Sequence, residues 1–177
     1  INLKLDNNIF LLLSTSGSTG SSKFVKISKE NIVSNTNAII NYLNMKSNDK
    51  TITNLPMNYS YGLSLVNSHL YVGGTIILSS KSIIDRQTIS LVEQNKISNF
   101  NGVPSTYEMI FKFKLESIYL KNLKYLTQAG GALNEGTYNK LNNLSKKYNN
   151  KFFIMYGQTE ASPRMSYLLA NNIKFKR

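Results

Sequence analysis

The 177-residue chain contains no cysteine, no tryptophan, three prolines and one histidine. Without cysteine, a disulfide scaffold and a cysteine-ligated metal centre are both excluded, and we predict a cytoplasmic location. No apolar run approaches the roughly 18 residues of a membrane span, and no segment resembles a secretory signal. The longest apolar run, residues 9–13, is instead predicted to form a buried strand.

Acidic residues are also scarce. Nine Asp and Glu residues stand against 21 Lys and Arg, which gives a formal net charge of +12. Proteins that bind nucleic acids usually gather such charge on one face. Here most lysines are single and dispersed, with short clusters at residues 112–114, 146–147 and 174–177. We interpret the charge as a solvated surface and predict no nucleic-acid partner, with polyanion binding as the weaker alternative.

Short apolar, β-branched runs alternate with longer amphipathic ones. The predicted strands are residues 9–15, 24–27, 51–55, 75–79, 97–101, 124–128, 151–156 and 165–169. The predicted helices are residues 28–43, 61–71, 86–95, 105–113 and 134–148, the first with Ser28 as its N-cap. This alternation predicts an α/β fold with a largely parallel sheet and flanking helices, in which ligands bind at the carboxyl ends of strands.

The most informative segment, residues 14–23, reads Ser-Thr-Ser-Gly-Ser-Thr-Gly-Ser-Ser-Lys. Gly17 and Gly20 permit positive φ, so successive N–H groups can form a nest for an anion. The hydroxyls and Lys23 add donors and charge, which suits a polyphosphate. A flexible Ser/Gly turn is the alternative. The segment is not a P-loop, because that motif needs glycine immediately before its lysine.

Two further segments follow predicted strands. In Tyr156-Gly157-Gln158-Thr159-Glu160, a ring can stack on a base, a hydroxyl can bond a phosphate and a carboxylate can hold Mg²⁺. In residues 130–133, Gly-Gly-Ala-Leu, the glycines let the backbone approach a flat ring. Taken alone, residues 156–160 are read first as a surface turn after a strand, and residues 130–133 are equally compatible with a helix-entry turn.

Together these segments resemble the AMP-forming acyl-adenylating superfamily, the AMP-dependent synthetases and ligases that include acyl-CoA synthetases, adenylation domains and luciferases. Residues 15–23 match the family's [ST]-S-G-[ST]-T-G-x-x-K at every fixed position, and residues 156–160 match its Y-G-x-T-E in the family's order. Residues 55–62 and 101–105 are similar to the family's acyl-site segments. The resemblance covers nearly the whole chain.

The resemblance implies a role for each matching position. The phosphates of ATP would be bound by Thr15, Ser16, Gly17, Ser18, Thr19, Gly20, Lys23 and Thr159. The adenine would contact Gly130, Gly131, Ala132, Tyr156 and Gly157, and Glu160 would coordinate Mg²⁺. The acyl pocket would include Tyr59, Tyr61, Gly62, Asn101 and Gly102. His69 matches no motif, and we interpret it as a packed or solvated helical residue without a functional role.

The implied reaction is the ATP-dependent, Mg²⁺-dependent activation of a small carboxylic acid to acyl-AMP, followed by transfer to the thiol of CoA or of a phosphopantetheine-bearing acyl-carrier protein. Amino-acid-activating relatives place an Asp beside the aromatic segment, to pair with the substrate amine. No Asp or Glu occurs between Asp49 and Asp85, which favours an acid without an α-amino group. The alternatives are an amino-acid-activating adenylation domain and a non-catalytic nucleotide-binding remnant.

We expect residues 1–177 to be an internal piece of the family's large N-terminal, AMP-binding domain. The chain begins at Ile1, and no Thr-Gly-Asp element follows Glu160. The family's small C-terminal domain, which carries a lysine that supports adenylation, has no counterpart here. Neither Lys174 nor Lys176 lies in a matching motif, so no catalytic residue is assigned. We therefore predict that the chain alone does not complete the reaction.

Overall fold

A largely parallel sheet forms the centre of the structure, a computed structural model that describes residues 6–15 and 23–170. Its main strands are β5 (Asn99–Gly102), β6 (Tyr125–Gln128), β7 (Lys151–Tyr156) and β8 (Ser166–Leu169). The first three are parallel, and β8 pairs with β7 in the antiparallel sense. A second parallel pair, β3 (Lys50–Ile52) and β4 (Thr75–Ile77), lies beside β5, where the Ser98 N–H donates to the Lys50 carbonyl at 2.8 Å. The predicted α/β fold is confirmed.

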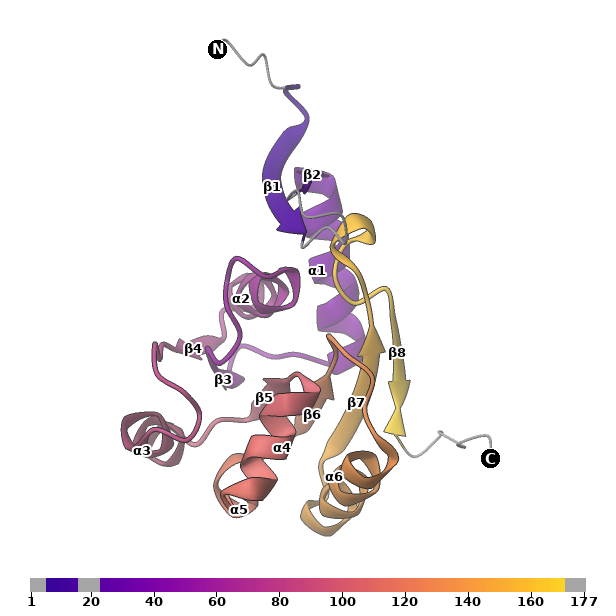
Figure 1. Cartoon of the computed structure of the whole chain (residues 1–177). Helices are drawn as coiled ribbons and strands as arrows, with labels where there is room; N and C mark the ends of the chain where they lie inside the picture. The colour runs from indigo at the N-terminus through magenta and orange to yellow at the C-terminus, as the bar shows by residue number, and fades with distance from the viewer. Residues whose placement is uncertain (1–5, 16–22, 171–177) are drawn as a thin grey trace.

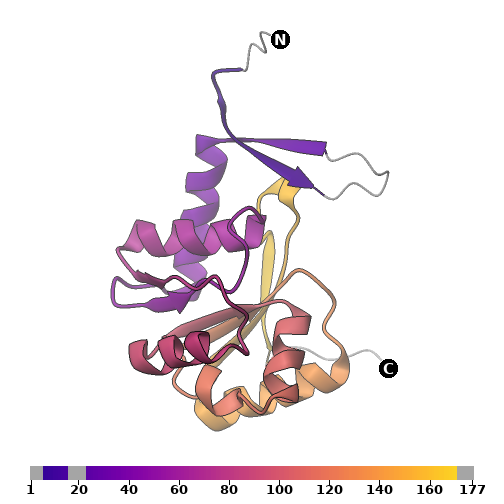
Figure 2. The same ribbon diagram turned by 60° about the vertical axis from the view of Figure 1, so that its left-hand side comes forward.

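Helices cover both faces of this sheet (Figures 1 and 2). They are α1 (Lys29–Leu43), α2 (Ser60–Val72), α3 (Arg86–Asn95), α4 (Pro104–Lys112), α5 (Glu116–Tyr119) and α6 (Glu135–Tyr148), with a 3₁₀ turn, η1 (Thr159–Ala161). Helices α1 and α2 lie on one side, and α3 to α6 lie on the other. The sequence did not predict α5 or η1, because a single helical turn is too short to show an amphipathic period.

Alternating side chains of β7 divide the core into two clusters. Phe152 packs among residues of α4, α5 and α6, and Ile154 lies against the same cluster. Phe153 and Met155 pack on the opposite face, with Ile39 of α1 and other residues. Successive side chains of a strand point to opposite faces, so a strand covered on both sides is apolar throughout.

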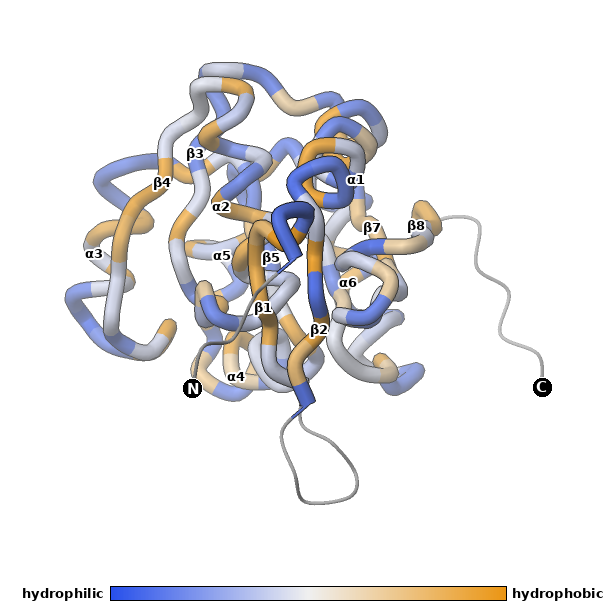
Figure 3. The backbone as a smooth tube through the Cα atoms, turned by 90° about the horizontal axis from the view of Figure 1, so that it is seen from above, coloured by the Kyte–Doolittle hydropathy of each residue, from blue (hydrophilic) through white to orange (hydrophobic). Residues whose placement is uncertain are grey.

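The strands β1 (Ile9–Thr15) and β2 (Lys23–Ser28) form an antiparallel hairpin that projects beyond the sheet (Figure 2). The prediction that residues 9–13 form a buried strand is wrong. Within that run Leu13 alone is buried, whereas Phe10 is 66% exposed and Leu12 is 40% exposed. A hairpin that packs on the body with one face leaves its other face open, and Figure 3 shows the resulting apolar stretches on β1.

Local signals set the helix starts as predicted. Ser28 caps α1, since its Oγ accepts from the Asn31 N–H at 3.1 Å and the Asn31 side chain accepts from the Ser28 N–H at 3.1 Å. Pro104 occupies the first turn of α4, where its missing N–H costs no hydrogen bond. Among the helices of residues 6–15 and 23–170, none is long and apolar enough to cross a bilayer.

Candidate functional site

The predicted segments gather where β5, β6 and β7 end. Gly102 is the last residue of β5, residues 130–133 follow β6, and Tyr156 is the last residue of β7. Because these strands are parallel, their carboxyl ends share one edge of the sheet. This is the edge at which open α/β sheets bind ligands.

The Thr159 hydroxyl lies at the start of α2. Its Oγ1 donates to Ser60 Oγ at 3.2 Å, and Ser60 is the first residue of that helix. The N-cap, Tyr59, makes no side-chain hydrogen bond to α2, so the first N–H groups of the helix have no side-chain cap. Glu160 follows in η1 and is exposed. Hydroxyl, uncapped helix end and carboxylate are therefore close together, an arrangement suited to a phosphate with a bound cation.

Glycine geometry brings the predicted adenine and acyl segments into contact. Gly130 has φ of +79°, and a Cβ added there would lie 2.9 Å from the hydroxyl oxygen of Tyr59. A Cβ on Gly131 would lie 3.2 Å from the Pro104 ring. Gly130, Gly131 and Ala132 are exposed, and Tyr156 is 62% exposed. These groups consequently form an accessible rim rather than part of the core.

Beneath this rim, the Tyr61 hydroxyl enters a buried polar chain. It lies 2.6 Å from Thr127 Oγ1, which itself donates to Asn101 Oδ1 at 2.7 Å. Since the single hydroxyl proton of Thr127 is used on Asn101, Tyr61 is the donor to Thr127. Burial raises the pKa of Tyr61, and the Arg164 charge and the Thr127 bond oppose this only in part. Asn101 is engaged inside the network and Gly102 is buried under Tyr107, so both support the wall from behind.

His69 is fully buried at the far end of the same network. Its Nδ1 lies 2.8 Å from the Leu65 carbonyl, which can only accept, so the proton is on Nδ1. Its Nε2 then accepts from Asn99 Nδ2 at 3.0 Å. Burial lowers the pKa of His69. Of the two expectations for His69, packed or solvated, the structure shows the packed one.

Sequence reasoning missed Arg164, which is 7% exposed. Gly157 makes its position possible, because a Cβ on Gly157 would collide with the Arg164 backbone nitrogen and lie 3.1 Å from its Cα. The glycine of the Tyr156–Glu160 segment therefore has a packing reason in addition to its predicted adenine contact. In the sequence, Arg164 was indistinguishable from the many dispersed surface cations.

The phosphate-loop residues Ser16, Gly17, Ser18, Thr19 and Gly20 lie outside the described residues. The residues that flank them are paired across the hairpin, with Thr15 Oγ1 3.5 Å from the Lys23 carbonyl. A cavity of about 20 Å³ lies between this hairpin and the site, because Leu11 and Leu13 line it together with Ser60 and Ser162. The hairpin thus adjoins the start of α2.

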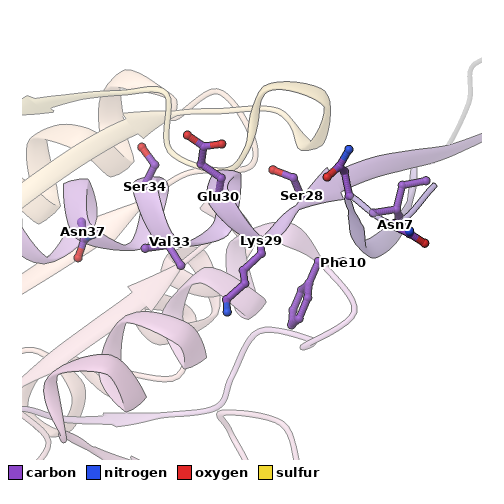
Figure 4. A pocket seen from close by; sticks show the side chains of 10 residues that line it. Asn7, Phe10, Ser28, Lys29, Glu30, Val33, Ser34 and Asn37 are labelled. Carbon is purple, nitrogen blue, oxygen red and sulfur yellow. The ribbon is translucent and has the colours of Figure 1, made fainter. Parts of the chain in front are cut away.

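A larger hollow of about 880 Å³ lies between β1 and α1 and is lined by Asn7, Phe10, Lys29 and neighbouring residues. Figure 4 shows Phe10 and Lys29 on one side of α1 and Glu30 and Ser34 on the other. Its few charged groups do not converge, and it contains none of the residues at the strand ends. Its size alone therefore does not make it the candidate site.

Comparison with known proteins agrees with the geometry. The chain is 28% identical over 162 residues to a feruloyl-CoA synthase from Amycolatopsis sp, covering 89% of this chain and 31% of the relative. It is 28% identical over 163 residues to a D-alanine–D-alanyl carrier protein ligase from Bacillus cereus (strain G9842), covering 90% of this chain and 32% of that protein. The chain thus spans about a third of the length of these curated relatives.

Among solved structures, O-succinylbenzoate coenzyme A synthetase from Bacillus subtilis, in complex with ATP and magnesium ion, superposes with a TM-score of 0.76 at 18% identity. The match covers 90% of this chain and 32% of the synthetase, and at this identity it shows a shared fold. The family model described as AMP-binding enzyme matches residues 3–176. The chain therefore belongs to the AMP-binding enzyme family.

Proposed function

We propose that this chain forms the nucleotide-binding part of an enzyme that converts a carboxylic acid and ATP into an acyl-adenylate and pyrophosphate. The acyl group then passes to the thiol of CoA or of a carrier protein. The observation that carries the proposal is the contact between Thr159 and Ser60 at the uncapped start of α2, directly after β7. A hydroxyl and free N–H groups at a helix N-terminus suit the α-phosphate at which the acid reacts.

The residues present fit ATP and Mg²⁺. Mg²⁺ is commonly held by one or two carboxylates together with substrate phosphates, so the exposed Glu160 is sufficient as its protein ligand. An all-protein metal cage is not needed, and none of the described residues form a group of three His, Asp or Glu that could hold an ion. The bound cation would offset charge on the phosphates, while Thr159 and the α2 N-terminus orient them.

The proposed substrate is a carboxylic acid without an α-amino group. The α2 start and the preceding loop contain no acidic side chain, and the nearest acidic residue before them, Asp49, is fully buried and paired with Lys124 at 2.6 Å. An ammonium group placed beside Tyr59 would therefore lack a counter-charge. The second candidate is activation of an amino acid, which the similarity to D-alanine–D-alanyl carrier protein ligase favours.

We further propose that residues 1–177 belong to the large domain of a longer enzyme and do not complete the reaction alone. The curated relatives are about three times as long as the matched region. In this family of reactions, closure of a second domain over the site is expected to complete the catalytic set. The purified chain should therefore release no AMP in an acid-dependent manner. Sustained turnover by the chain alone would contradict this part of the proposal.

Binding of AMP to the 177-residue chain tests the nucleotide site without requiring turnover. Calorimetric titration of wild type is compared with Thr159→Val, which removes a hydroxyl that would turn its proton from Ser60 Oγ to the phosphate, and should weaken binding about tenfold. Thr75→Val is the matched control, because Thr75 is an exposed residue of β4 and should have no effect. Failure of the wild-type chain to bind AMP, or equal weakening in both variants, would argue against the proposal.

A further inference from the structure

Arg164 is a buried cation that forms no ion pair within the part of the chain that the structure describes. It is 7% exposed, and its Nε has no hydrogen-bond partner. Across residues 6–15 and 23–170, the ion pairs are Lys124 with Asp49 and Lys140 with Glu116, so neither neutralises Arg164. Buried guanidinium groups are normally paired, because removing a charge from water is costly. The unpaired state of Arg164 therefore requires an explanation.

The guanidinium lies against the aromatic wall of the candidate acyl site. Its Cζ is 5.0 Å from the centroid of the Tyr61 ring, a cation–π distance. Tyr42 also interacts with the guanidinium, since burial raises the pKa of Tyr42 while the charge and hydrogen bonding of Arg164 lower it. Arg164, Tyr42 and Tyr167 also border a hollow of about 460 Å³. The charge therefore lies beside aromatic rings and next to open volume.

The stacking on Tyr61 does not replace a counter-ion. Cation–π contacts contribute a modest attraction, whereas the desolvation cost of a buried ion is several times larger. An arginine that stays buried despite this desolvation cost is typical of a ligand-binding site, because its planar guanidinium matches the geometry of a carboxylate. The backbone supports this placement, since the missing Cβ of Gly157 lets the Arg164 segment approach the end of β7.

We propose that Arg164 binds a second carboxylate at the far end of the acid substrate. The inference rests on the proposed function and names its substrate class: dicarboxylic acids, of which one carboxylate reacts and the other pairs with Arg164. The same positive charge repels a substrate ammonium group. It thereby opposes the amino-acid alternative with an observation separate from the scarcity of acidic residues.

The test is equilibrium binding of succinate, glutarate, adipate and suberate to the 177-residue chain, each compared with its monomethyl ester. In wild type, at least one diacid should bind about tenfold or more tightly than its ester. Arg164→Met should abolish that preference and leave ester binding unchanged. Arg164→Lys keeps the charge without the planar fork and should retain part of the preference. No preference in wild type, or the same preference in Arg164→Met, overturns the inference.

Unfolding in urea separates a binding role from a structural one. If Arg164 is kept for a ligand, Arg164→Met should be at least as stable as the unliganded wild type, because an uncompensated buried charge is removed. Marked destabilisation of Arg164→Met would assign Arg164 to the fold and overturn the inference. AMP binding by the same proteins keeps the two proposals distinct. If the wild-type chain binds AMP but shows no preference for a diacid over its ester, only the inference about Arg164 is overturned. If it neither binds AMP nor shows that preference, the proposed function is contradicted as well.

Discussion

Replacing Thr127 by valine should reveal how strongly the buried polar chain behind the site contributes to stability. The substitution keeps the shape and removes one hydroxyl. Thr127 Oγ1 donates to Asn101 Oδ1 at 2.7 Å and accepts from the Tyr61 hydroxyl at 2.6 Å. Thr127 and Asn101 are 0% and 2% exposed, so water does not replace the lost partner.

The size of the stability loss depends on which hydrogen bonds the two partners of Thr127 keep. Tyr61 can still donate to the Thr127 carbonyl at 3.2 Å, so its loss is small. Asn101 Oδ1 has Thr127 as its donor and would be left unsatisfied, which costs about 1–3 kcal/mol on top of about 1 kcal/mol for the lost bond. We expect Thr127→Val to lower the free energy of unfolding by about 2–4 kcal/mol. Tyr61→Phe leaves no partner without any hydrogen bond and should lower the free energy of unfolding by about 1 kcal/mol.

Urea denaturation followed by circular dichroism measures both variants and their combination. In the Thr127→Val background, Tyr61→Phe should cost less than in wild type, because the shared hydrogen bond is already absent. Thr75→Val, on an exposed strand residue, should lie within about 0.5 kcal/mol of wild type. A Thr127→Val protein as stable as this control would refute the network as a source of stability. Fully additive single effects would refute the coupling.

Gly157→Ala should destabilise the chain by about 1–3 kcal/mol in the same assay, because its methyl group meets the Arg164 backbone, whereas Gly136→Ala on α6 meets nothing closer than 3.5 Å and should be neutral or stabilising. Equal effects would contradict the packing role of Gly157. The pKa of His69 is held below its ordinary 6.5, so the unfolded chain takes up the proton first and stability should fall as the pH drops below that value. His69→Gln should flatten this acid slope of the urea midpoint, and an unchanged slope would exclude His69 as its source. Glu160→Gln should raise the Mg²⁺ concentration needed for ATP binding, while an unaltered Mg²⁺ titration would show that Glu160 is not a ligand.

Much of the fold could be predicted because its signals are local. The Ser28 cap, Pro104 at the start of α4 and the apolar period of each segment depend on neighbours in the chain, and their predicted elements are found. Burial of β1 was predicted wrongly because hydrophobicity does not reveal whether one or both faces of a strand are covered. The short α5 and η1 escaped prediction because they carry too few residues for a pattern.

The candidate site also has a part that the sequence predicted and a part that it did not. The motifs at residues 15–23 and 156–160 were readable because a binding loop needs particular residue types in fixed order, and the family they indicated is confirmed. The individual roles carried over from the resemblance stay predictions. The contact of Thr159 with Ser60 joins positions 99 residues apart, and no pattern of spacing in the sequence predicts it.

The sequence by itself therefore determined the family, the order of the strands and the longer helices, and the residue types available to hold a nucleotide, since each is encoded within short segments. Only the tertiary structure decided which polar groups lose their water and which partners they find there. Arg164 is one dispersed cation among 21 basic residues in the sequence, and becomes a buried charge with no ion pair among the described residues only when α1 and α2 pack around it. Burial depends on contacts between distant segments, and it is burial that turns an ordinary charge into a group that requires a partner.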